Sequence, residues 1–407
     1  MSFLARRRHR KLAALPGVRA LRRPVAPGAG EQFDLHYVRT GPRGGTPLVI
    51  IPGGPGMASI AAYQGIRNRA AAGGHDVIMV EHRGVGMSRR DDSGADLPPA
   101  ALTIEQVVDD VAAVLDDAGV DTAAVYGASY GTYLAAGVGV RHPGRVRAMV
   151  LDSPLLNRHD FDVVRSEARA LLWHDDTALA AKARTLAEAK VLASEDLTIV
   201  AVIYGLGGPE LLERHLDFLL DGRRALWAGM RWAVLKVARR KVAYHNEFDL
   251  IGPMGFRELN FAGTPDGQPL DTTLTWSGVP AAQTPFEGEP FDLVAEMPGF
   301  HWPTVVVSGG RDLITPAAVA DRITGLLPAP TRLLLPTAGH SMLDTRHDVA
   351  LRIIAEVAGG RPEALAGQDA ALEALPVGRS VRMASQALAG AARLAAMLPR
   401  TGRPLTS

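Results

Sequence analysis

The sequence contains no cysteine. Disulfide bonds, thiol catalysis and zinc or iron–sulfur centres held by cysteine are therefore excluded. The sequence also lacks an excess of charge of either sign, because 44 lysines and arginines face 43 aspartates and glutamates, which gives a formal net charge of +1. An extended surface for nucleic acid needs a clear excess of basic residues. We therefore expect no nucleic acid among the partners.

Long hydrophobic runs are missing at the amino end. Residues 1–24 carry eight Lys/Arg and no acid, and their longest apolar run, 12–16, is too short for the core of a signal peptide. We expect no export signal, no transmembrane segment and a cytoplasmic location. Residues 1–30 are predicted to be a flexible basic leader, with a weak contact to a membrane surface or nucleic acid as the alternative.

One stretch combines a strand, a sharp turn and a helix around a single serine. An apolar run, 122–126, ends at Gly127, and a helical pattern resumes directly after Ser129. In such a Gly-x-Ser-x-Gly turn, Gly127 and Gly131 leave room for neighbouring elements while the serine backbone is strained. The hydroxyl then projects at a helix N-terminus, where free N–H groups stabilise negative charge on an attacked carbonyl oxygen. We interpret Ser129 as a candidate nucleophile.

Predicted strands and helices alternate on both sides of this turn. The chain is long enough, at 407 residues, for a large domain with an insertion or for two domains. The alternation predicts an α/β fold, with a mostly parallel sheet covered by helices on both faces. We assign residues 31–154 and 302–360 to this core, with strands at 33–40, 47–51, 76–80, 122–126, 147–151, 304–307 and 331–335.

The alternation stops between residues 155 and 301. Long helical stretches are predicted there at 168–192, 209–220 and 225–242, followed by a segment rich in glycine and proline. We interpret residues 155–301 as a helical lid inserted into the sheet domain.

The carboxyl end, residues 361–407, is an alanine-rich tail. Its segment 381–398 is weakly amphipathic, with arginines on one side. We expect a helix that packs on the rest of the chain rather than a membrane anchor.

A nucleophilic serine needs a base that takes its proton and an acid that orients the base. On this architecture both should follow later strands, in the chain order Ser, Asp, His. Asp312 follows the strand at 304–307, and His340 follows the strand at 331–335. We predict His340 as the base and Asp312 as the acid.

Asp152 is the alternative acid, because it also ends a predicted strand. Since Asp152 comes just before the lid, we expect its carboxylate to bind the backbone of the turn that leads into the lid.

The oxyanion hole needs two backbone donors. We predict the N–H of Tyr130, directly after the nucleophile, and the N–H of Gly54. Gly54 belongs to a loop, 52–56, that follows a buried strand and has almost no side chains. A plain turn is the other interpretation of this loop.

Three motifs resemble the α/β-hydrolase superfamily, and the resemblance covers residues 33–359. Within that superfamily they are similar to the branch of proline iminopeptidases and the tripeptidyl aminopeptidases of actinobacteria, which has Asp-Gln-Arg-Gly-x-Gly-x-Ser as its second motif. The three motifs here are Gly53-Gly54-Pro55-Gly56, Glu81-His82-Arg83-Gly84-Val85-Gly86-Met87-Ser88 and Gly127-Ala128-Ser129-Tyr130-Gly131-Thr132.

The resemblance implies that Ser129, Asp312 and His340 are the catalytic triad. Two positions depart from it, because Pro52 and Tyr130 stand where the iminopeptidases usually have histidine and tryptophan. The sequence is therefore closer to the tripeptidyl side or to an esterase-like relative.

We expect a serine hydrolase that forms an acyl-enzyme on Ser129 and uses no cofactor and no metal. The resemblance favours an aminopeptidase, proline iminopeptidase-like or tripeptidyl aminopeptidase-like, acting on a small-molecule or short-peptide substrate. In that branch, carboxylates of the lid bind the free amine of the substrate, but we assign none of the acids of this lid, such as Glu247, Asp249 and Glu258.

Other functions stay open. A carboxylesterase or lactonase acting on small apolar esters is the alternative, because the lid is rich in Trp, Leu and Ala. An acyltransferase and a binding module without catalysis are further possibilities. A dinucleotide site at Gly84 and Gly86 is disfavoured, since Arg89 stands where a third glycine is needed.

Overall fold

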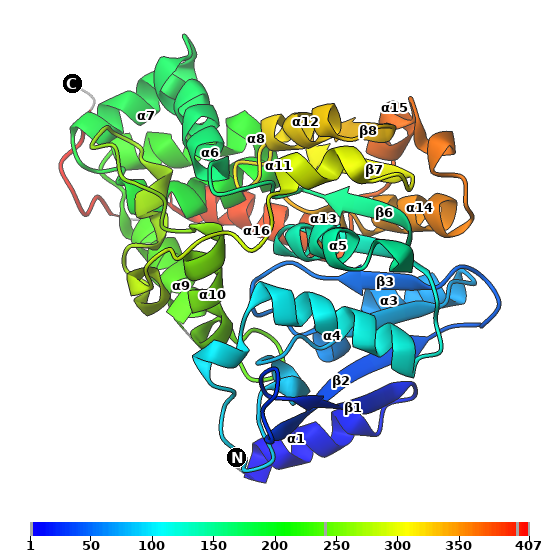
Figure 1. The fold of residues 1–407 in the computed structure, drawn as a ribbon. Coiled ribbons are helices and arrows are strands. Elements are labelled where there is room, and N and C mark those ends of the chain that lie inside the picture. The colour runs from blue at the N-terminus through cyan, green and yellow to red at the C-terminus, as the bar shows by residue number, and fades with distance from the viewer. Residues whose placement is uncertain (1–2, 240–241, 396–398, 406–407) are drawn as a thin grey trace.

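The structure, a computed structural model, describes residues 3–239, 242–395 and 399–405. Eight strands form one sheet in the order β1-β2-β4-β3-β5-β6-β7-β8 (Figure 1). The first two pairings, β1 with β2 and β2 with β4, are antiparallel, and all later neighbours are parallel. The strands are β1 (Val18–Pro24), β2 (Gln32–Thr40), β3 (Leu48–Ile51), β4 (Val77–Val80), β5 (Ala123–Ala128), β6 (Val146–Asp152), β7 (Thr304–Gly309) and β8 (Pro330–Leu335).

Helices cover both faces of this sheet, which confirms the predicted fold class. One face carries α4 (Ile104–Asp117), α5 (Tyr130–Arg141) and α12 (Ala317–Leu326). The other carries α3 (Gln64–Ala72) and α14 (His347–Ala358), with the short helices α2 (Ser59–Ala62) and α13 (Met342–Thr345) near its strand ends.

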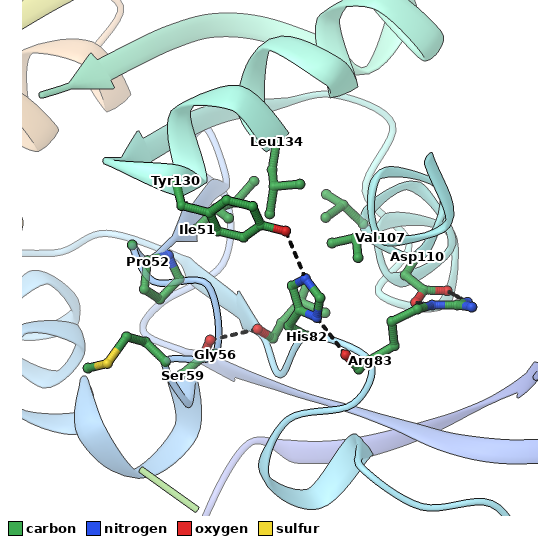
Figure 2. Close-up of a pocket in the computed structure, with 14 residues that line it drawn as sticks. Ile51, Pro52, Gly56, Ser59, His82, Arg83, Val107, Asp110, Tyr130 and Leu134 are labelled. Atoms are coloured by element: carbon green, nitrogen blue, oxygen red, sulfur yellow. Dashed lines mark hydrogen bonds and ion pairs between the residues drawn. The ribbon is translucent and has the colours of Figure 1, made fainter. Parts of the chain in front are cut away.

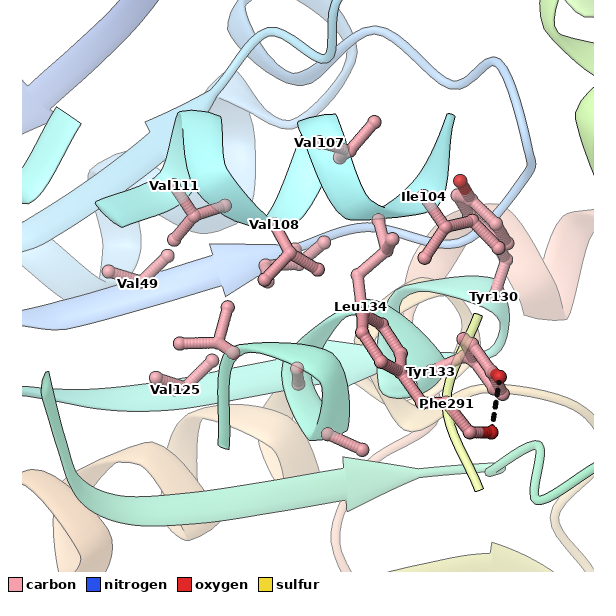
Figure 3. Close-up of a cluster of buried hydrophobic side chains, with 14 of the residues drawn as sticks. Val49, Ile104, Val107, Val108, Val111, Val125, Tyr130, Tyr133, Leu134 and Phe291 are labelled. Carbon is pink, nitrogen blue, oxygen red and sulfur yellow. Dashed lines mark hydrogen bonds between the residues drawn. The ribbon is translucent and has the colours of Figure 1, made fainter. Parts of the chain in front are cut away.

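Side chains of the inner strands alternate between these two layers. Val49 and Val125 pack with α4 and α5 (Figure 3), whereas Leu48 and Tyr126 belong to the cluster on the opposite face. Because both faces are buried, the strands are apolar without interruption, which is why their sequence shows continuous hydrophobic runs. Each fully buried aliphatic side chain of this kind contributes about 1.5–3 kcal/mol.

Residues between β6 and β7 form the helical region on the left of Figure 1. Its helices are α6 (Asp160–Arg169), a π-helical turn η4 (Ala170–His174), α7 (Ala178–Glu188), α8 (Leu197–Leu220), α9 (Ala225–Arg239), α10 (Phe248–Leu259) and the short α11 (Leu293–Glu296). We call residues 155–301 the lid, as a name for this region.

The predicted helical stretch at 168–192 is interrupted in the structure. The chain leaves the α-helical path at η4, and α7 begins at Ala178, after the N-cap Thr177, whose side chain accepts a hydrogen bond from the N–H of Ala180. Within α8 (Leu197–Leu220), Gly208 has the non-helical angles φ +70° and ψ −169°, so two helices meet there at a kink. The second begins at Pro209, which confirms the predicted helix at 209–220.

The amino end differs from the predicted flexible leader. Residues 3–13 form α1 (Phe3–Ala13), and β1 pairs with β2 at the sheet edge. Leu12 and Val18 pack against the core, and Arg23 binds the buried Asp110 at 2.9 Å. The composition of this segment is dominated by arginines, which lie beside the residues that pair with the sheet. Its apolar contacts are therefore not apparent from the sequence.

The carboxyl end contains α15 (Asp369–Glu373) and α16 (Arg379–Ala395). Helix α16 contacts α8 and α9, and its Leu388 and Ala389 join the apolar cluster of the lid. The predicted helix at 381–398 therefore exists and packs within the chain, although residues 396–398 lie outside the described part. Within that part, no helix is long and apolar enough to cross a membrane.

Candidate active site

The turn after β5 holds Ser129 in an unusual backbone conformation. Its φ is +52° and its ψ is −125°, and it is the N-cap of α5. A side chain at either flanking glycine would collide, because a Cβ at Gly127 would lie 2.3 Å from the carbonyl oxygen of Gly131, and one at Gly131 would lie 2.2 Å from that of Ile51. The two glycines thus allow the sharp turn from strand to helix that presents the serine.

Three residues that are far apart in the chain meet at this turn. The hydroxyl oxygen of Ser129 lies 2.8 Å from Nε2 of His340, and Nδ1 of His340 lies 2.8 Å from Oδ2 of Asp312. Strands β5, β6, β7 and β8 run parallel and side by side, so the loops after β5, β7 and β8 open at the same sheet edge. When Nδ1 donates its proton to Asp312, Nε2 is free to accept the proton of the serine.

The pKa values of Asp312 and His340 are set by burial and by the attraction between the two side chains. Burial favours the neutral carboxyl of Asp312, but the charge of His340 and its hydrogen bond outweigh burial and lower the pKa of Asp312 below its ordinary value. Backbone N–H groups of Thr315 and Ile314 add to this, at 2.9 and 2.8 Å. For His340 burial acts against the charged form, yet Asp312 dominates and raises the histidine pKa.

Thr315 is a neighbour of this array that sequence reasoning missed. Its hydroxyl lies 3.0 Å from Oδ2 of Asp312, 3.2 Å from Nδ1 of His340 and 2.9 Å from the carbonyl oxygen of Ser153. The sequence did contain a signal for this contact, because Thr315 lies three residues after Asp312 and Asp side chains often bind the backbone a few residues on.

Asp152 does not bind the turn that leads into the lid, so that expectation is wrong. Its carboxylate accepts hydrogen bonds from the N–H groups of Met342 and Leu343, at 2.9 and 2.8 Å, and from the hydroxyl of Tyr126 at 2.9 Å. It therefore fixes the backbone just after His340. Burial raises the pKa of Asp152 to about 6.

The turn into the lid is held by a different acid. The carboxylate of Asp160 accepts hydrogen bonds from the N–H groups of Leu156 and Asn157, at 2.6 and 3.0 Å. Asp152 ends β6, which lies between β5 and β7 in the sheet, and its carboxylate binds the loop that follows β8.

The residues predicted for the oxyanion hole lie beside the serine. Tyr130 is the first residue of α5, so its N–H has no acceptor within the helix. Gly54, Ser129 and Tyr130 line the same cavity. A Cβ at Gly53 would come within 3.1 Å of Cβ of Ser129, so glycine allows this close approach.

The glycine loop is tied to the lid. The carbonyl oxygen of Gly56 accepts a hydrogen bond from the N–H of Glu247 at 2.9 Å, and the N–H of Ala58 donates to the carbonyl of His245 at 3.0 Å. A lid segment thereby fixes the loop that carries Gly54.

The side chain of Tyr130 points down to a histidine of the second motif (Figure 2). Its hydroxyl lies 3.2 Å from Nε2 of His82, and Nδ1 of His82 lies 2.5 Å from the carbonyl oxygen of Arg83. Because a carbonyl only accepts, Nδ1 carries the proton and Nε2 accepts from Tyr130. Burial lowers the pKa of His82 to about 4 and raises that of Tyr130, so both stay neutral. This bond anchors the residue after Ser129, and sequence reasoning did not find it.

A cavity of about 560 Å³ opens onto Ser129 between the core and the lid. Much of its wall is aromatic and comes from the lid: Phe161, Phe248, Phe256, Phe261 and Trp276. The described part of the chain contains no cluster of three or more histidines and acids suited to a metal ion.

Comparisons with known proteins agree with this architecture. Residues 46–188 match the sequence model of a family described as "alpha/beta hydrolase fold". A putative carbamate hydrolase RutD of Azorhizobium caulinodans is 33% identical over 122 residues, which is 30% of this chain and 42% of the relative. A proline iminopeptidase of Heyndrickxia coagulans is 28% identical over 114 residues, 28% of this chain and 37% of the relative. The matched region thus spans about two fifths of the length of each.

Solved structures show the same fold over most of the chain. The proline iminopeptidase of Mycobacterium smegmatis has a TM-score of 0.52 at 18% identity, covering 85% of this chain and 99% of that one. VinJ has a TM-score of 0.50 at 17% identity, covering 84% and 98%. The chain therefore has the α/β-hydrolase fold, and in sequence it is similar to hydrolases of that superfamily, among them a proline iminopeptidase.

Proposed function

We propose that the protein is a serine hydrolase that forms an acyl-enzyme on Ser129. The observation that carries the proposal is the continuous array of hydroxyl, imidazole and carboxylate, with 2.8 Å at each step. A module that only binds would not need these three groups in line, so the array argues against that function.

In the first half of the reaction, Oγ of Ser129 attacks the carbonyl carbon of the substrate while Nε2 of His340 takes its proton. Asp312 holds the imidazole and stabilises the imidazolium that forms. The N–H groups of Tyr130 and Gly54 are proposed to bind the oxyanion. His340 then protonates the leaving group, the bond between carbonyl carbon and leaving group breaks, and the acyl group stays on Ser129.

The second half returns the enzyme to its starting state. A water molecule loses a proton to Nε2 of His340 and attacks the acyl carbon. The tetrahedral intermediate collapses, His340 returns the proton to Oγ of Ser129, and the carboxylic acid leaves.

Two substrate types fit this chemistry. The aminopeptidase hypothesis is supported by the three motifs and by the similarity to a proline iminopeptidase. The hypothesis of a carboxylesterase or lactonase is supported by the apolar wall of the cavity.

We propose that residues 155–301 act as a lid on a core formed by 31–154 and 302–360, because the cavity lies between these two regions. The proposed substrate is a small molecule or a short peptide, and the proposed location is cytoplasmic.

A fluorophosphonate probe tests the proposal directly. We expect stoichiometric labelling of the wild-type protein on the peptide that contains Ser129, and none in Ser129→Ala. The control is Ser277→Ala, which removes an exposed serine of the lid and should label like wild type. Labelling that survives in Ser129→Ala, or that is absent from folded wild type, contradicts the proposal.

A further inference from the structure

We propose that the cavity binds an uncharged and largely apolar acyl group, so that the enzyme prefers esters of such acids to substrates with a free amine. This inference rests on the proposed function and names the substrate class of the same site. It excludes the amine subsite that an aminopeptidase needs.

The wall of the cavity is the first observation. None of the described residues that line it carries a charge. The core contributes residues around the nucleophile, such as Met57 and Ile314, and the lid contributes aromatic rings. The polar side chains of the lid wall are neutral: Thr198, Asn246, Thr272 and Thr275.

The second observation concerns the lid acids Glu247, Asp249 and Glu258. None of them lines the cavity, and each binds protein groups elsewhere. Glu247 accepts a hydrogen bond from the N–H of Gly86, and Asp249 binds Arg89 at 2.9 Å.

Glu258 is engaged in the same way. It binds Arg257 and accepts a hydrogen bond from the N–H of Ile104 at 2.8 Å, at the start of α4. These acids join the lid to the core, so each is already engaged by protein partners.

The cavity should therefore bind an ammonium group weakly. It carries three donors and is strongly hydrated, and burial without an anion or enough acceptors is costly. Aromatic faces attract cations, but the lid rings pack on one another, with centroids 5.6 Å apart for Phe161 and Phe261 and 6.0 Å for Phe256 and Phe261. Cation attraction of this kind suits weakly hydrated cations better than a primary ammonium.

The size of the cavity sets the size of the group. A volume of about 560 Å³ lies within the range of sites that enclose drug-sized ligands. We infer an acyl group larger than acetyl, with a ring or an extended chain that contacts Phe248 and Trp276, whose rings stack 6.1 Å apart.

Two esters that differ in one group test the inference. The p-nitrophenyl esters of 3-phenylpropanoic acid and of L-phenylalanine are identical except for the α-amine of the second. Both are assayed near pH 6, so that the amine is largely protonated even though the ester group lowers its pKa below that of an ordinary α-amine. Each kcat/KM is divided by the rate of hydroxide hydrolysis, which removes the difference in intrinsic reactivity.

We expect the uncharged ester to be favoured at least about tenfold on this scale. A smaller ratio, or a preference for the phenylalanine ester, overturns the inference.

A matched pair of variants locates the selectivity. Thr275→Asp places a carboxylate in the half-buried wall of the cavity, and Thr275→Asn has nearly the same shape without the charge. Relative to Thr275→Asn, the ratio in Thr275→Asp should move toward the amine by at least about tenfold. Equal ratios in two folded variants overturn the inference; if Thr275→Asp does not fold, the wild-type ratio decides alone.

Labelling by the fluorophosphonate, measured on the same preparation, separates the two proposals. Absence of labelling on Ser129 means that the proposed function has failed. Labelling together with a preference for the amine, or with no turnover of the uncharged ester, overturns only the substrate class.

Discussion

The core and the lid contribute different groups to one site. The core side carries the serine, histidine and aspartate array, whose ionisable groups are held by hydrogen bonds at the ends of parallel strands. The lid side, among its described residues, presents aromatic and neutral side chains. On the proposed function, reaction chemistry resides in the core and substrate choice in the lid, so substitutions in the two parts should change different kinetic constants.

The largest effect is expected for the acid of the core. Replacing such an aspartate with asparagine in a related triad lowers turnover by roughly four orders of magnitude, because the imidazole loses its orientation and charge partner. We expect Asp312→Asn to lower kcat at least about a hundredfold with little change in melting temperature.

The control for that variant is Asp152→Asn on the neighbouring strand. Asn keeps only one oxygen acceptor for the N–H groups of Met342 and Leu343, so about 1–3 kcal/mol of stability should be lost while kcat falls much less. Thermal melts and ester kinetics on both purified variants check the ranking. The reverse ranking would show that Asp152 is the acid.

A smaller effect on kcat is expected for the hydrogen bond between Tyr130 and His82. Tyr130→Phe removes the hydrogen bond to His82, which loosens the residue whose N–H is proposed to bind the oxyanion. We expect kcat to fall about tenfold with KM nearly unchanged, since an oxyanion donor acts mainly in the transition state.

Tyr133→Phe is a matched control on the same helix, because its hydroxyl donates to the carbonyl of Phe291 at 3.1 Å, away from the nucleophile. It should lose stability without losing kcat. Equal kinetics in the two variants would remove the positioning role of the pair Tyr130 and His82.

Substitutions in the lid should change KM rather than kcat. Trp276→Ala removes apolar contact from the wall of the cavity and leaves the array untouched. For a bulky ester we expect KM to rise about tenfold, which corresponds to about 1.4 kcal/mol of lost binding, with kcat within a few-fold of wild type. The rate of fluorophosphonate labelling should not change. A loss of kcat as large as that in Tyr130→Phe would contradict the division of roles.

The smallest effect is a shift in the pH profile. His340 must be neutral to accept the serine proton, and although burial disfavours its charge, Asp312 raises its pKa above 6.5. Activity should therefore fall as the pH drops through a value above 6.5. In Asp312→Asn this midpoint should move to lower pH. A midpoint that does not move would show that the titrating group is not paired with Asp312.

The sheet could be predicted because its strands are buried on both faces. Residues such as Leu48, Val49 and Ile50 form an uninterrupted apolar run, and Gly127 and Gly131 mark a turn that tolerates no larger residue. Parallel pairing then places Asp312 and His340 at the edge where Ser129 lies.

Other features depend on contacts between distant segments and left no local signal. Strand β1 is stabilised by pairing with β2, although its composition is that of a basic leader. The partner of Asp152 is a backbone nearly two hundred residues later, at Met342. The lid acids are likewise committed to Gly86, Arg89 and Ile104, which only the folded chain brings near.

Trapping the acyl-enzyme tests whether Ser129 is the nucleophile. Wild-type protein is mixed with p-nitrophenyl 3-phenylpropanoate, quenched in acid within the first turnover, digested and examined by mass spectrometry. We expect a mass increase of one 3-phenylpropanoyl group on the peptide that carries Ser129, together with an initial burst of p-nitrophenolate. Turnover with the acyl group on another residue, or with the peptide of Ser129 never modified even when deacylation is slowed, would contradict it.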